Sequence, residues 1–319
     1  MQKRRLGRLG PEVPAIILGG NVYGWTLDEA ESLRQLDRAV DLGLNCIDTA
    51  DVYSRWAPGH QGGESETIIG KWFATRGRRS DVILATKVGM DMGDGKKGLK
   101  GQYIRQAVEA SLRRLQTDYI DLYQAHSDDE LANQEETLEA FNALVQAGKV
   151  RYIGASNYVG ARLEMAIKTS RANGWAEYVS IQPHYNLVER AKFETDLLPV
   201  VRKYEIGVIP YFALGAGFLT GKYRRGSDTS GVARGGMVKK YFNDQGFAVV
   251  DALDDVAARH DATAAQVALA WLLAQPGVTA PIASATSDKH LDDLVAATSL
   301  RLSDEDLRQL NEVSAGVAA

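Results

Sequence analysis

Cysteine is nearly absent from this chain, whose 319 residues include only Cys46. A single thiol excludes an intramolecular disulfide framework and the zinc sites built from two or four cysteines, and we expect no metal centre. Long hydrophobic runs are missing too, because stretches such as 15–18 and 267–274 are far shorter than the roughly 20 apolar residues that cross a bilayer. The N-terminus lacks an apolar segment of signal-peptide length. We therefore expect a cytoplasmic protein without a membrane segment.

The chain also has no excess of positive charge. Its 37 Lys and Arg residues against 41 Asp and Glu residues give a formal net charge of −4. Nucleic-acid binding needs a positive footprint for the phosphates, so we expect no nucleic-acid partner. At about 150 residues per domain the length permits two domains, but α/β barrels of this size fold as one unit. We expect a single domain over residues 1–319.

Short apolar segments recur along the sequence and alternate with amphipathic ones. The first seven begin 28 to 37 residues apart, which suits a strand plus a helix, and the last interval is 71 residues. Apolar residues three and four apart predict helices between them, as at 32–40, 103–115 and 138–145. Continuously apolar strands joined by helices predict a parallel sheet, and eight such units predict a (β/α)₈ TIM barrel. The segments begin near residues 15, 46, 82, 119, 150, 179, 207 and 278.

A doubly wound Rossmann sheet is the rival architecture. It would place a G-x-G-x-x-G turn after the first strand, and the sequence at 19–24 lacks that spacing. The barrel is therefore the preferred interpretation. Turn signals at Gly7 and Gly10-Pro11 predict an N-terminal β-hairpin able to plug the bottom of the barrel, and Ser303 is a suitable cap for an extra C-terminal helix.

Ionisable side chains stand at the ends of neighbouring predicted strands. Asp48 ends the second strand, Lys87 the third and His126 the fourth, and Tyr53 follows in the loop after the second. Each of these side chains alone has an ordinary structural explanation. The aspartate can cap a turn, the lysine can lie exposed on the surface, the histidine can be hydrogen-bonded in the core, and the tyrosine can be half-buried packing. Chemistry in barrels gathers at the C-terminal ends of strands, and neighbouring strands lie about 5 Å apart. The four side chains can therefore meet.

Together these residues are suited to protonating an oxyanion. Tyrosine has an ordinary pKa of about 10, and a nearby positive charge lowers it. Lys87, held in place by Asp48, would supply that charge beside Tyr53, and His126 can hydrogen-bond a carbonyl oxygen. We therefore expect a lowered pKa for Tyr53 and proton donation as a hydride reaches the carbonyl carbon.

Six stretches of the sequence resemble the aldo-keto reductases, a family of NADPH-dependent barrel enzymes. The likeness extends over nearly the whole chain, and all four positions of the family's catalytic tetrad carry the expected residue types. The matching stretches are NCIDTADVY, ILATKVG, TDYIDLYQAH, VRYIGASNY, QPHYNLVER and LGAGFLTGKY.

The resemblance implies how such a chain holds its cofactor and performs its reaction. Hydride passes between nicotinamide and an aldehyde, ketone or alcohol, with Tyr53 as the proton donor and His126 positioning the oxygen. Ser156, Asn157 and Gln182 would hold the carboxamide, and Tyr211 would stack on the ring. The remaining cofactor residues that the resemblance implies are Gly20, Asn21, Asp48, Phe212, Leu214, Gly215, Gly217, Thr220, Lys222, Arg234, Ser284, Thr286, His290 and Asp293.

Two departures from the family pattern concern the cofactor. Ser284, His290 and Leu294 stand where many members carry Lys, Arg, Gln or Asn near the 2′-phosphate, although Lys289 remains a possible contact. Phe212-Ala213 replaces a frequent Ser-Pro. A 2′-phosphate is bound best by paired cations, and the inserted loop can supply further basic side chains. We expect NADPH or NADP⁺ in preference to NADH.

Aromatic residues near the strand ends are candidates to line the mouth of the barrel around a small carbonyl or alcohol substrate. These are Tyr23, Trp25, Trp56 and His184, which combine apolar area with polar atoms. Packing beneath the loops is the alternative role.

Two other classes of function stay open. The first is a nicotinamide-binding regulatory or sensor barrel with weak or no turnover, because the aldo-keto reductase family, which the sequence resembles, includes channel-associated β subunits. A barrel isomerase or aldolase acting on sugar phosphates is the other, with Lys87 forming a Schiff base or Asp48 acting as a base. No heptad or apolar stripe in the sequence indicates a particular oligomeric state.

Overall fold

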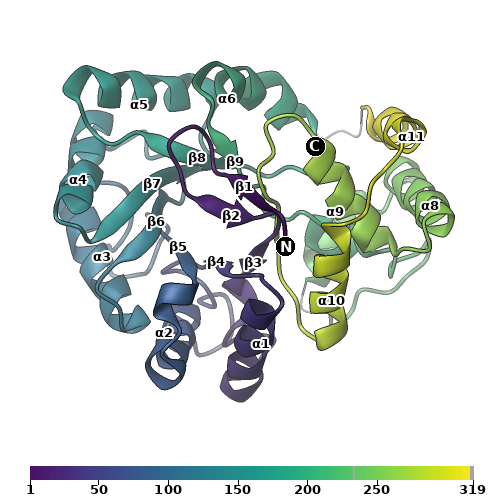
Figure 1. Ribbon diagram of the computed structural model, residues 1–319, viewed down its shortest axis with the longest axis horizontal. Helices are drawn as coiled ribbons and strands as arrows, with labels where there is room; N and C mark the ends of the chain where they lie inside the picture. The colour runs from purple at the N-terminus through teal and green to yellow at the C-terminus, as the bar shows by residue number, and fades with distance from the viewer. Residues whose placement is uncertain (233, 317–319) are drawn as a thin grey trace.

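Eight parallel strands curl into one sheet at the centre of the molecule (Figure 1), in a computed structural model that describes residues 1–232 and 234–316. The order in the sheet is β10-β3-β4-β5-β6-β7-β8-β9. A parallel bridge between Val208 and Val278, in which Thr279 N donates to Val208 O at 2.8 Å, brings β9 to the start of the last strand segment. This confirms the expected barrel. The strands are β3 (Ile17–Gly19), β4 (Cys46–Asp48), β5 (Ile83–Val88), β6 (Ile120–Ala125), β7 (Val150–Ser156), β8 (Tyr178–Gln182), β9 (Gly207–Val208) and β10 (Ile282–Ala283).

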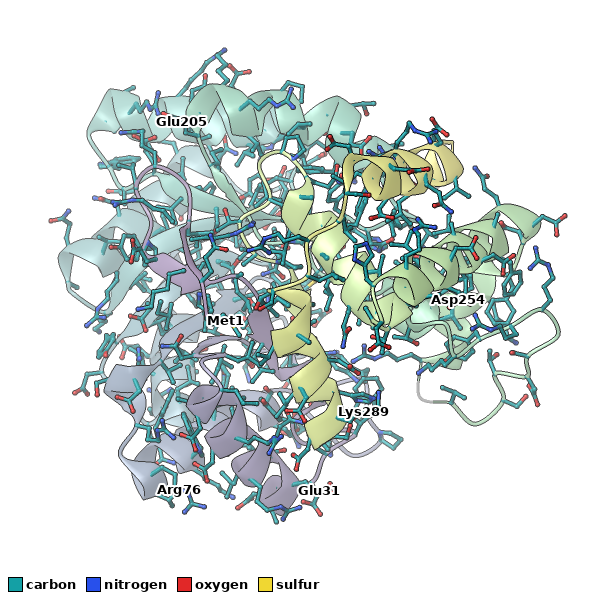
Figure 2. The ribbon with its side chains drawn as sticks, turned by 45° about the vertical axis from the view of Figure 1, so that its right-hand side comes forward. Met1, Glu31, Arg76, Glu205, Asp254 and Lys289 are labelled. Atoms are coloured by element: carbon teal, nitrogen blue, oxygen red, sulfur yellow. The ribbon has the colours of Figure 1, made fainter. Side chains whose placement is uncertain are left out.

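Helices surround the sheet and cover its outer face (Figure 1). The segments predicted to be helical at 32–40, 103–115 and 138–145 fall inside α1, α3 and α4. Charged side chains of both signs cover the outer surface, as around Arg76, Asp254 and Lys289 in Figure 2. The helices are α1 (Glu29–Asp41), α2 (Glu64–Arg76), α3 (Gly101–Leu115), α4 (Gln134–Gln146), α5 (Gly160–Asn173), α6 (Leu198–Tyr204), α7 (Gly235–Val238), α8 (Asp244–Arg259), α9 (Ala264–Ala274), α10 (Asp288–Ala297) and α11 (Asp304–Ser314).

The long interval before the last strand holds additional helices. Between β9 and β10 the chain forms α7, α8 and α9, whereas the other strand pairs are joined through one main helix each. None of the helices in the described ranges is both long and apolar enough to cross a bilayer.

An N-terminal hairpin closes one end of the barrel. Strands β1 (Lys3–Arg5) and β2 (Glu12–Pro14) pair antiparallel and lie across the centre of the barrel in Figure 1. Leu6 and Val13 belong to the apolar cluster inside the barrel, so the hairpin acts as the expected plug. The barrel residues of that cluster are Ile17, Cys46, Ala85, Leu122, Val179, Ile209, Ala280 and Ile282.

The hairpin is fastened to late parts of the chain. Arg8 N donates to Glu205 O at 2.8 Å, and the Arg4 guanidinium donates to Leu273 O at 3.1 Å. Gly7 has a φ of +64°, and a Cβ built there would lie 2.6 Å from Gly207 N. Only glycine allows this approach of two backbones.

The extra C-terminal helix α11 begins at the expected cap. The Ser303 side chain accepts from Asp306 N at 3.1 Å, and Asp306 accepts in return from Ser303 N, which completes a capping box. Trp271 Nε1 of α9 donates to Asn311 Oδ1 at 2.9 Å and fixes the helix against the barrel's outer layer.

Candidate active site

Inward-facing side chains change from apolar to polar along the central strands. Because side chains alternate along a strand, residues two apart face the same side. Ala85 lies in the apolar interior and Lys87 follows on the same face of β5, and Leu122 is followed in the same way by Gln124 on β6. Asp48 ends β4 beside them. The strands thus place a polar cluster above the apolar interior, at their C-terminal ends.

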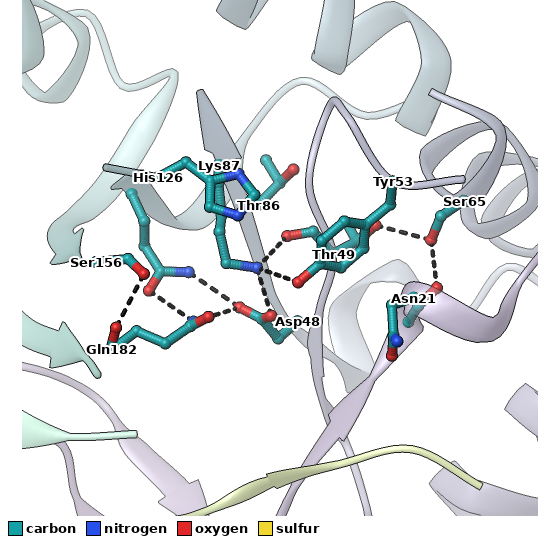
Figure 3. A network of polar contacts seen from close by, with 12 residues as sticks. Asn21, Asp48, Thr49, Tyr53, Ser65, Thr86, Lys87, His126, Ser156 and Gln182 are labelled. Atoms are coloured by element: carbon teal, nitrogen blue, oxygen red, sulfur yellow. Dashed lines mark hydrogen bonds and ion pairs between the residues drawn. The ribbon is translucent and has the colours of Figure 1, made fainter. Parts of the chain in front are cut away.

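Lys87 is the centre of this cluster (Figure 3). Its side chain is fully buried, at 0% exposure. The ammonium group donates to Asp48 Oδ2 at 2.5 Å, to the Thr49 carbonyl oxygen at 2.8 Å and to the Tyr53 hydroxyl oxygen at 2.8 Å. An ammonium has three N–H donors, so each one has a partner here. Lys87 is held rigidly, and its charge is directed at the oxygen of Tyr53.

The electrostatics keep this lysine charged. Burial alone favours the neutral amine, but the Asp48 carboxylate and Tyr53 more than offset it, and the pKa of Lys87 lies above its ordinary value. A Schiff base forms from a neutral amine. The environment of Lys87 therefore disfavours the aldolase-type interpretation.

Tyr53 corrects one sequence-based expectation. Burial raises the pKa of Tyr53 more than the charge of Lys87 lowers it, so the net direction is upward and not downward. The phenol is consequently protonated at neutral pH. Lys87 still reduces the cost of forming the phenolate, because its ammonium group already donates to the phenolic oxygen.

Two glutamines hold the other oxygen of Asp48. Gln124 Nε2 and Gln182 Nε2 both donate to Asp48 Oδ1 at 3.0 Å, and Gln182 Nε2 also lies 3.1 Å from Gln124 Oε1. Sequence reasoning missed Gln124. The signal was available, because Gln124 precedes His126 by two residues and therefore faces the same side of its strand.

His126 lies beside Tyr53 at the mouth of the barrel. The two rings are 6.0 Å apart between centroids and meet edge to face. Burial, reinforced by the charge of Lys87, holds the pKa of His126 well below its ordinary value. The imidazole is therefore neutral at pH 7, with one N–H able to donate to a substrate oxygen. Its Nδ1 has no hydrogen-bond partner within the described part of the chain.

The residues expected at the carboxamide lie together on the next strands. Ser156 Oγ donates to the Gln182 carbonyl oxygen at 2.9 Å, and Asn157 Nδ2 donates to the His126 carbonyl oxygen at 2.9 Å. Tyr211 OH donates to Asn157 Oδ1 at 2.8 Å, which fixes the half-buried ring beside this group. A planar amide-bearing ring fits this combination of donors, acceptors and an aromatic face.

Positive φ angles are concentrated in the turn after Tyr211, which the family resemblance assigns to the pyrophosphate. Gly215, Ala216 and Gly217 are three consecutive residues with positive φ, at 56°, 57° and 100°. Gly215 N and Gly217 N donate within the turn, to Phe212 O at 2.8 Å and to Leu214 O at 2.9 Å, so these two N–H groups are not open to an anion. Phe212 also has a positive φ, and its carbonyl accepts from Asn186 Nδ2 at 2.9 Å.

Neighbouring predicted residues complete this turn. Leu214 O accepts from Gly217 N at 2.9 Å, and Thr220 Oγ1 donates to Gly217 O at 2.8 Å. Lys222 also reaches the turn, since a Cβ built on Gly217 would lie 3.3 Å from Lys222 Nζ. The turn therefore brings the Lys222 ammonium group beside Gly217, and this cation is what the turn offers to an anion.

The segment expected at the adenosine end makes two polar contacts with or among predicted cofactor residues. Ser284 Oγ donates to Asn21 Oδ1 at 2.5 Å, next to Gly20 at the end of β3. His290 Nδ1 lies 3.2 Å from Thr286 Oγ1, and burial lowers the pKa of the imidazole, an effect to which Lys222 also contributes.

Two residues of α10 contribute less to a phosphate site than their types suggest. Lys289 Nζ is paired with Asp293 Oδ2 at 3.2 Å, and Asp293 also accepts from Gln266 at 2.7 Å. Leu294 is a core residue at 3% exposure. Among the cations of this region, Lys222 carries no competing carboxylate in the described residues.

The aromatic residues of the mouth divide into two groups. Trp25 and Trp56 pack edge to face at 5.4 Å, and Trp56 also contacts Tyr53 at 5.8 Å. His184 instead stacks on Tyr211 at 5.2 Å. The expectation that Tyr23 lines the mouth is wrong for this structure, because its side chain is 0% exposed and packs in the core.

A buried charged cluster behind the site was missed by sequence reasoning. Glu66, at 0% exposure, accepts from Thr86 Oγ1 at 2.6 Å and from Arg114 Nε at 2.7 Å. Asp51 is buried nearby, and neither carboxyl oxygen has a hydrogen-bond partner in the ranges that the structure describes. Burial, and then the charge of Glu66, raises the pKa of Asp51 to about 8. Nothing in its local sequence distinguishes Asp51 from a surface loop residue.

Comparison with known proteins agrees with this geometry. The sequence model of the Aldo/keto reductase family matches residues 15–315, and the chain belongs to that family. It is 37% identical to the uncharacterized oxidoreductase YrpG of Bacillus subtilis, over 99% of this chain and 97% of the relative. It is 30% identical to the versiconal hemiacetal acetate reductase of Aspergillus parasiticus, over 98% and 96%. It is also 33% identical to a putative voltage-gated potassium channel subunit beta of Schizosaccharomyces pombe, over 97% and 92%.

Proposed function

We propose that this aldo-keto reductase is an NADPH-dependent carbonyl reductase that interconverts an aldehyde or ketone and the corresponding alcohol, with Tyr53 as the proton donor. The observation that carries the proposal is the buried Lys87 ammonium group, which donates at once to Asp48 and to the Tyr53 hydroxyl oxygen. A neutral phenol beside a fixed cation is suited to releasing a proton to an oxyanion.

When bound, the cofactor supplies the hydride, and the residues of this chain manage the oxygen. His126 donates a hydrogen bond to the carbonyl oxygen and sets its direction. As charge develops on that oxygen, Tyr53 transfers its proton to it, and the resulting phenolate is stabilised by the Lys87 ammonium group. Asp48, held by Gln124 and Gln182, keeps the ammonium group in place. In the reverse direction Tyr53 takes the proton back.

The described residues fit a dinucleotide in two places. The Ser156, Asn157 and Tyr211 group suits the nicotinamide end, and the turn at Gly215–Gly217, with Lys222 beside it, suits the pyrophosphate. The preference for NADPH depends on cations near the 2′-phosphate, where Lys289 is paired with a carboxylate and His290 has a lowered pKa. Lys222 lies close enough to His290 for its charge to help lower that pKa, so its charge extends to this end of the site and supports NADPH over NADH by a modest margin.

A second candidate function is a nicotinamide-binding regulatory barrel with weak turnover. The similarity to the putative channel subunit of Schizosaccharomyces pombe favours keeping it. Such a protein could carry the same cofactor site, so measured turnover distinguishes the two.

The test is oxidation of NADPH and NADH by the purified protein against aromatic aldehydes, aliphatic aldehydes, dicarbonyls and sugars. We expect turnover with NADPH preferred, and a loss of at least about 100-fold in kcat for Tyr53→Phe. Cofactor binding, followed by nicotinamide fluorescence, should be unchanged in that variant. Tyr204→Phe is the matched control, because its hydroxyl donates to Glu164 at 2.8 Å on the outer layer.

The outcomes separate the candidates. Full activity of Tyr53→Phe would show that another group donates the proton. Tight NADPH binding without turnover on the whole panel would favour the regulatory function, and failure to bind either cofactor would contradict both.

A further inference from the structure

His184 is stacked against the aromatic ring of Tyr211, just past the end of β8. The two residues form a parallel bridge, and their rings lie 5.2 Å apart between centroids with an interplanar angle of 18°. Phe212 meets the imidazole edge to face at 5.5 Å. His184 therefore occupies one face of the half-buried Tyr211 ring, so a second planar group can stack only on the opposite face.

Tyr211 connects His184 with the reacting end of the site. Its hydroxyl donates to Asn157 Oδ1 at 2.8 Å, which fixes the plane of the ring. Burial raises the pKa of Tyr211 to about 12, and the charges of Glu189 and Tyr53 act in the same direction. The ring of Tyr211 therefore lies within electrostatic reach of the proton donor, Tyr53.

The imidazole of His184 has an unsatisfied nitrogen and charged neighbours. Its Nε2 is buried and has no hydrogen-bond partner in residues 1–232 and 234–316. Burial lowers the pKa of His184, Glu189 opposes this shift, and Lys240 and Lys192 reinforce it. Glu189 is itself paired with Lys240. The imidazole is therefore neutral at pH 7, and a proton taken up by it would place a poorly balanced charge behind the stacked phenol.

The two redox forms of a nicotinamide ring differ in charge, because the oxidised ring is a cation and the reduced ring is neutral. The face of a tyrosine ring attracts a cation. A second positive charge on the other face of the same ring repels that cation. Tyr211 backed by a neutral His184 therefore suits both forms, whereas a protonated His184 selects against the oxidised form.

We propose that His184 makes the site discriminate between the redox forms of its cofactor, because the neutral imidazole permits NADP⁺ to bind and the protonated imidazole weakens NADP⁺ relative to NADPH. His184 acts through Tyr211 and is a positioning residue, without a contact to the substrate. The phosphates are common to both forms, so their contacts and titration cancel from the ratio of the two dissociation constants. This inference rests on the proposed function, since it requires the nicotinamide ring to stack on Tyr211.

The binding test measures the Kd for NADP⁺ and for NADPH by titration calorimetry at about pH 7.5 and about pH 5.5. We expect the ratio of the Kd for NADP⁺ to that for NADPH to rise at least about threefold in the wild type as the pH falls. In His184→Phe, which keeps an aromatic ring against Tyr211, the ratio should change by less than about 1.5-fold. In His184→Arg the ratio should exceed that of the wild type at least about fivefold at about pH 7.5, because a guanidinium stacks on aromatic rings and is always charged.

A spectroscopic test reports the same coupling from the side of the histidine. Coupling between two sites is reciprocal, so the pKa of His184 should be lower in the NADP⁺ complex than in the NADPH complex. The measurement is a pH titration of protein labelled with ¹³C-histidine, followed by NMR, with the His184 signal assigned by its absence in His184→Phe. His260 is the internal control, because its ring contacts Asp306 at 2.7 Å at the junction of α8 and α11. Its signal should titrate identically in both complexes.

The outcomes separate this proposal from the reductase function. An equal change of the Kd ratio with pH in the wild type and in His184→Phe would overturn the role of His184, as would a His184 signal that titrates identically in the two complexes. If His184→Arg does not fold, these two comparisons still decide. Absence of turnover together with the expected Kd ratios would contradict only the reductase proposal. Failure to bind either cofactor would contradict both.

Discussion

The Lys87 ammonium group donates to the phenolic oxygen of Tyr53 at 2.8 Å, although the lysine lies inside a strand and the tyrosine in a turn. The turn is tied to the strand by its backbone, since Asp51 N donates to Lys87 O at 3.3 Å and Tyr53 N donates to Ala50 O at 3.2 Å. Main-chain bonds thus fix the two backbone positions from which the Lys87 and Tyr53 side chains reach each other.

Lys87→Met is predicted to lose both turnover and stability. Without the ammonium group, the phenolate has no stabilising charge, and we expect kcat to fall at least about 100-fold. Asp48 would also be left buried without its cation, which costs about 3–5 kcal/mol of unfolding free energy. Steady-state kinetics and urea unfolding measure the two losses.

The double variant Asp48→Asn with Lys87→Met separates these effects. Removing the orphaned carboxylate charge should restore part of the stability but none of the turnover. If activity returned together with stability, the lysine would have only a structural role.

His126→Ala is predicted to keep some activity. Orientation of the carbonyl oxygen is easier to replace than proton donation, so we expect kcat to fall about tenfold, with His126→Gln less affected because its amide can still donate. Because the pKa of His126 lies below its ordinary value, its titration should leave activity flat between about pH 7 and pH 8. A change of activity with pH in that range that disappears in His126→Gln would show that the imidazole is not neutral there.

Asp51→Asn is predicted to stabilise the protein at alkaline pH. The folded pKa of Asp51 is about 8, against about 4 for an unfolded aspartate. Between these values the folded state keeps a proton that the unfolded state releases, so the unfolding free energy falls as pH rises, by at most about 1.4 kcal/mol per pH unit. Removing the titration should raise stability by about 1–3 kcal/mol at pH 8, with little gain at pH 4.

The measurement is urea unfolding at both pH values. Asp255→Asn, at an exposed position on α8, is the matched control, and its unfolding free energy should follow that of the wild type at both pH values. An equal effect of Asp51→Asn at pH 4 and pH 8 would mean that Asp51 is not protonated in the folded protein.

Gly217→Ala is predicted to weaken cofactor binding. Gly217 has a φ of +100°, and the added Cβ would lie 3.3 Å from the Lys222 side chain. Both the turn and the Lys222 ammonium group should shift, and we expect the Kd for NADPH to rise at least about tenfold. Gly226→Ala provides the control, because its φ is also positive, at +83°, but a Cβ there meets nothing within 4 Å. Similar losses in both variants would indicate strain of the loop in general.

Most of the fold could be predicted from the sequence, because each strand is a short apolar run with turn signals at its ends. The eight predicted segments begin within a few residues of β3 to β10, with the largest offset at β10, where the run from Val278 starts before Ile282. A continuous apolar run shows that a segment is buried, but it does not show where hydrogen bonding begins.

The site was less predictable wherever it depends on burial. Sequence reasoning placed Lys87 beside Tyr53, yet the direction of the Tyr53 pKa depends on how deeply the phenol is enclosed. Tyr23 was assigned to the mouth because it follows a strand, whereas its ring turns into the core. The isolation of Asp51 depends on Glu66 and Arg114 in other elements, and no local pattern records those distances.

The N-terminal plug has a consequence for how the molecule is assembled. Residues 1–14 are synthesised before the barrel strands, but Arg4 hydrogen-bonds Leu273, 269 positions later in the chain. Long-range contacts of this kind form slowly, because the intervening chain must already be ordered. The hydrogen bond that fastens the hairpin to α9 can therefore form only after Leu273 has been synthesised. A nascent chain that ends before α9 lacks this fastening of the barrel floor, although the early strands that pack against Leu6 and Val13 are already made.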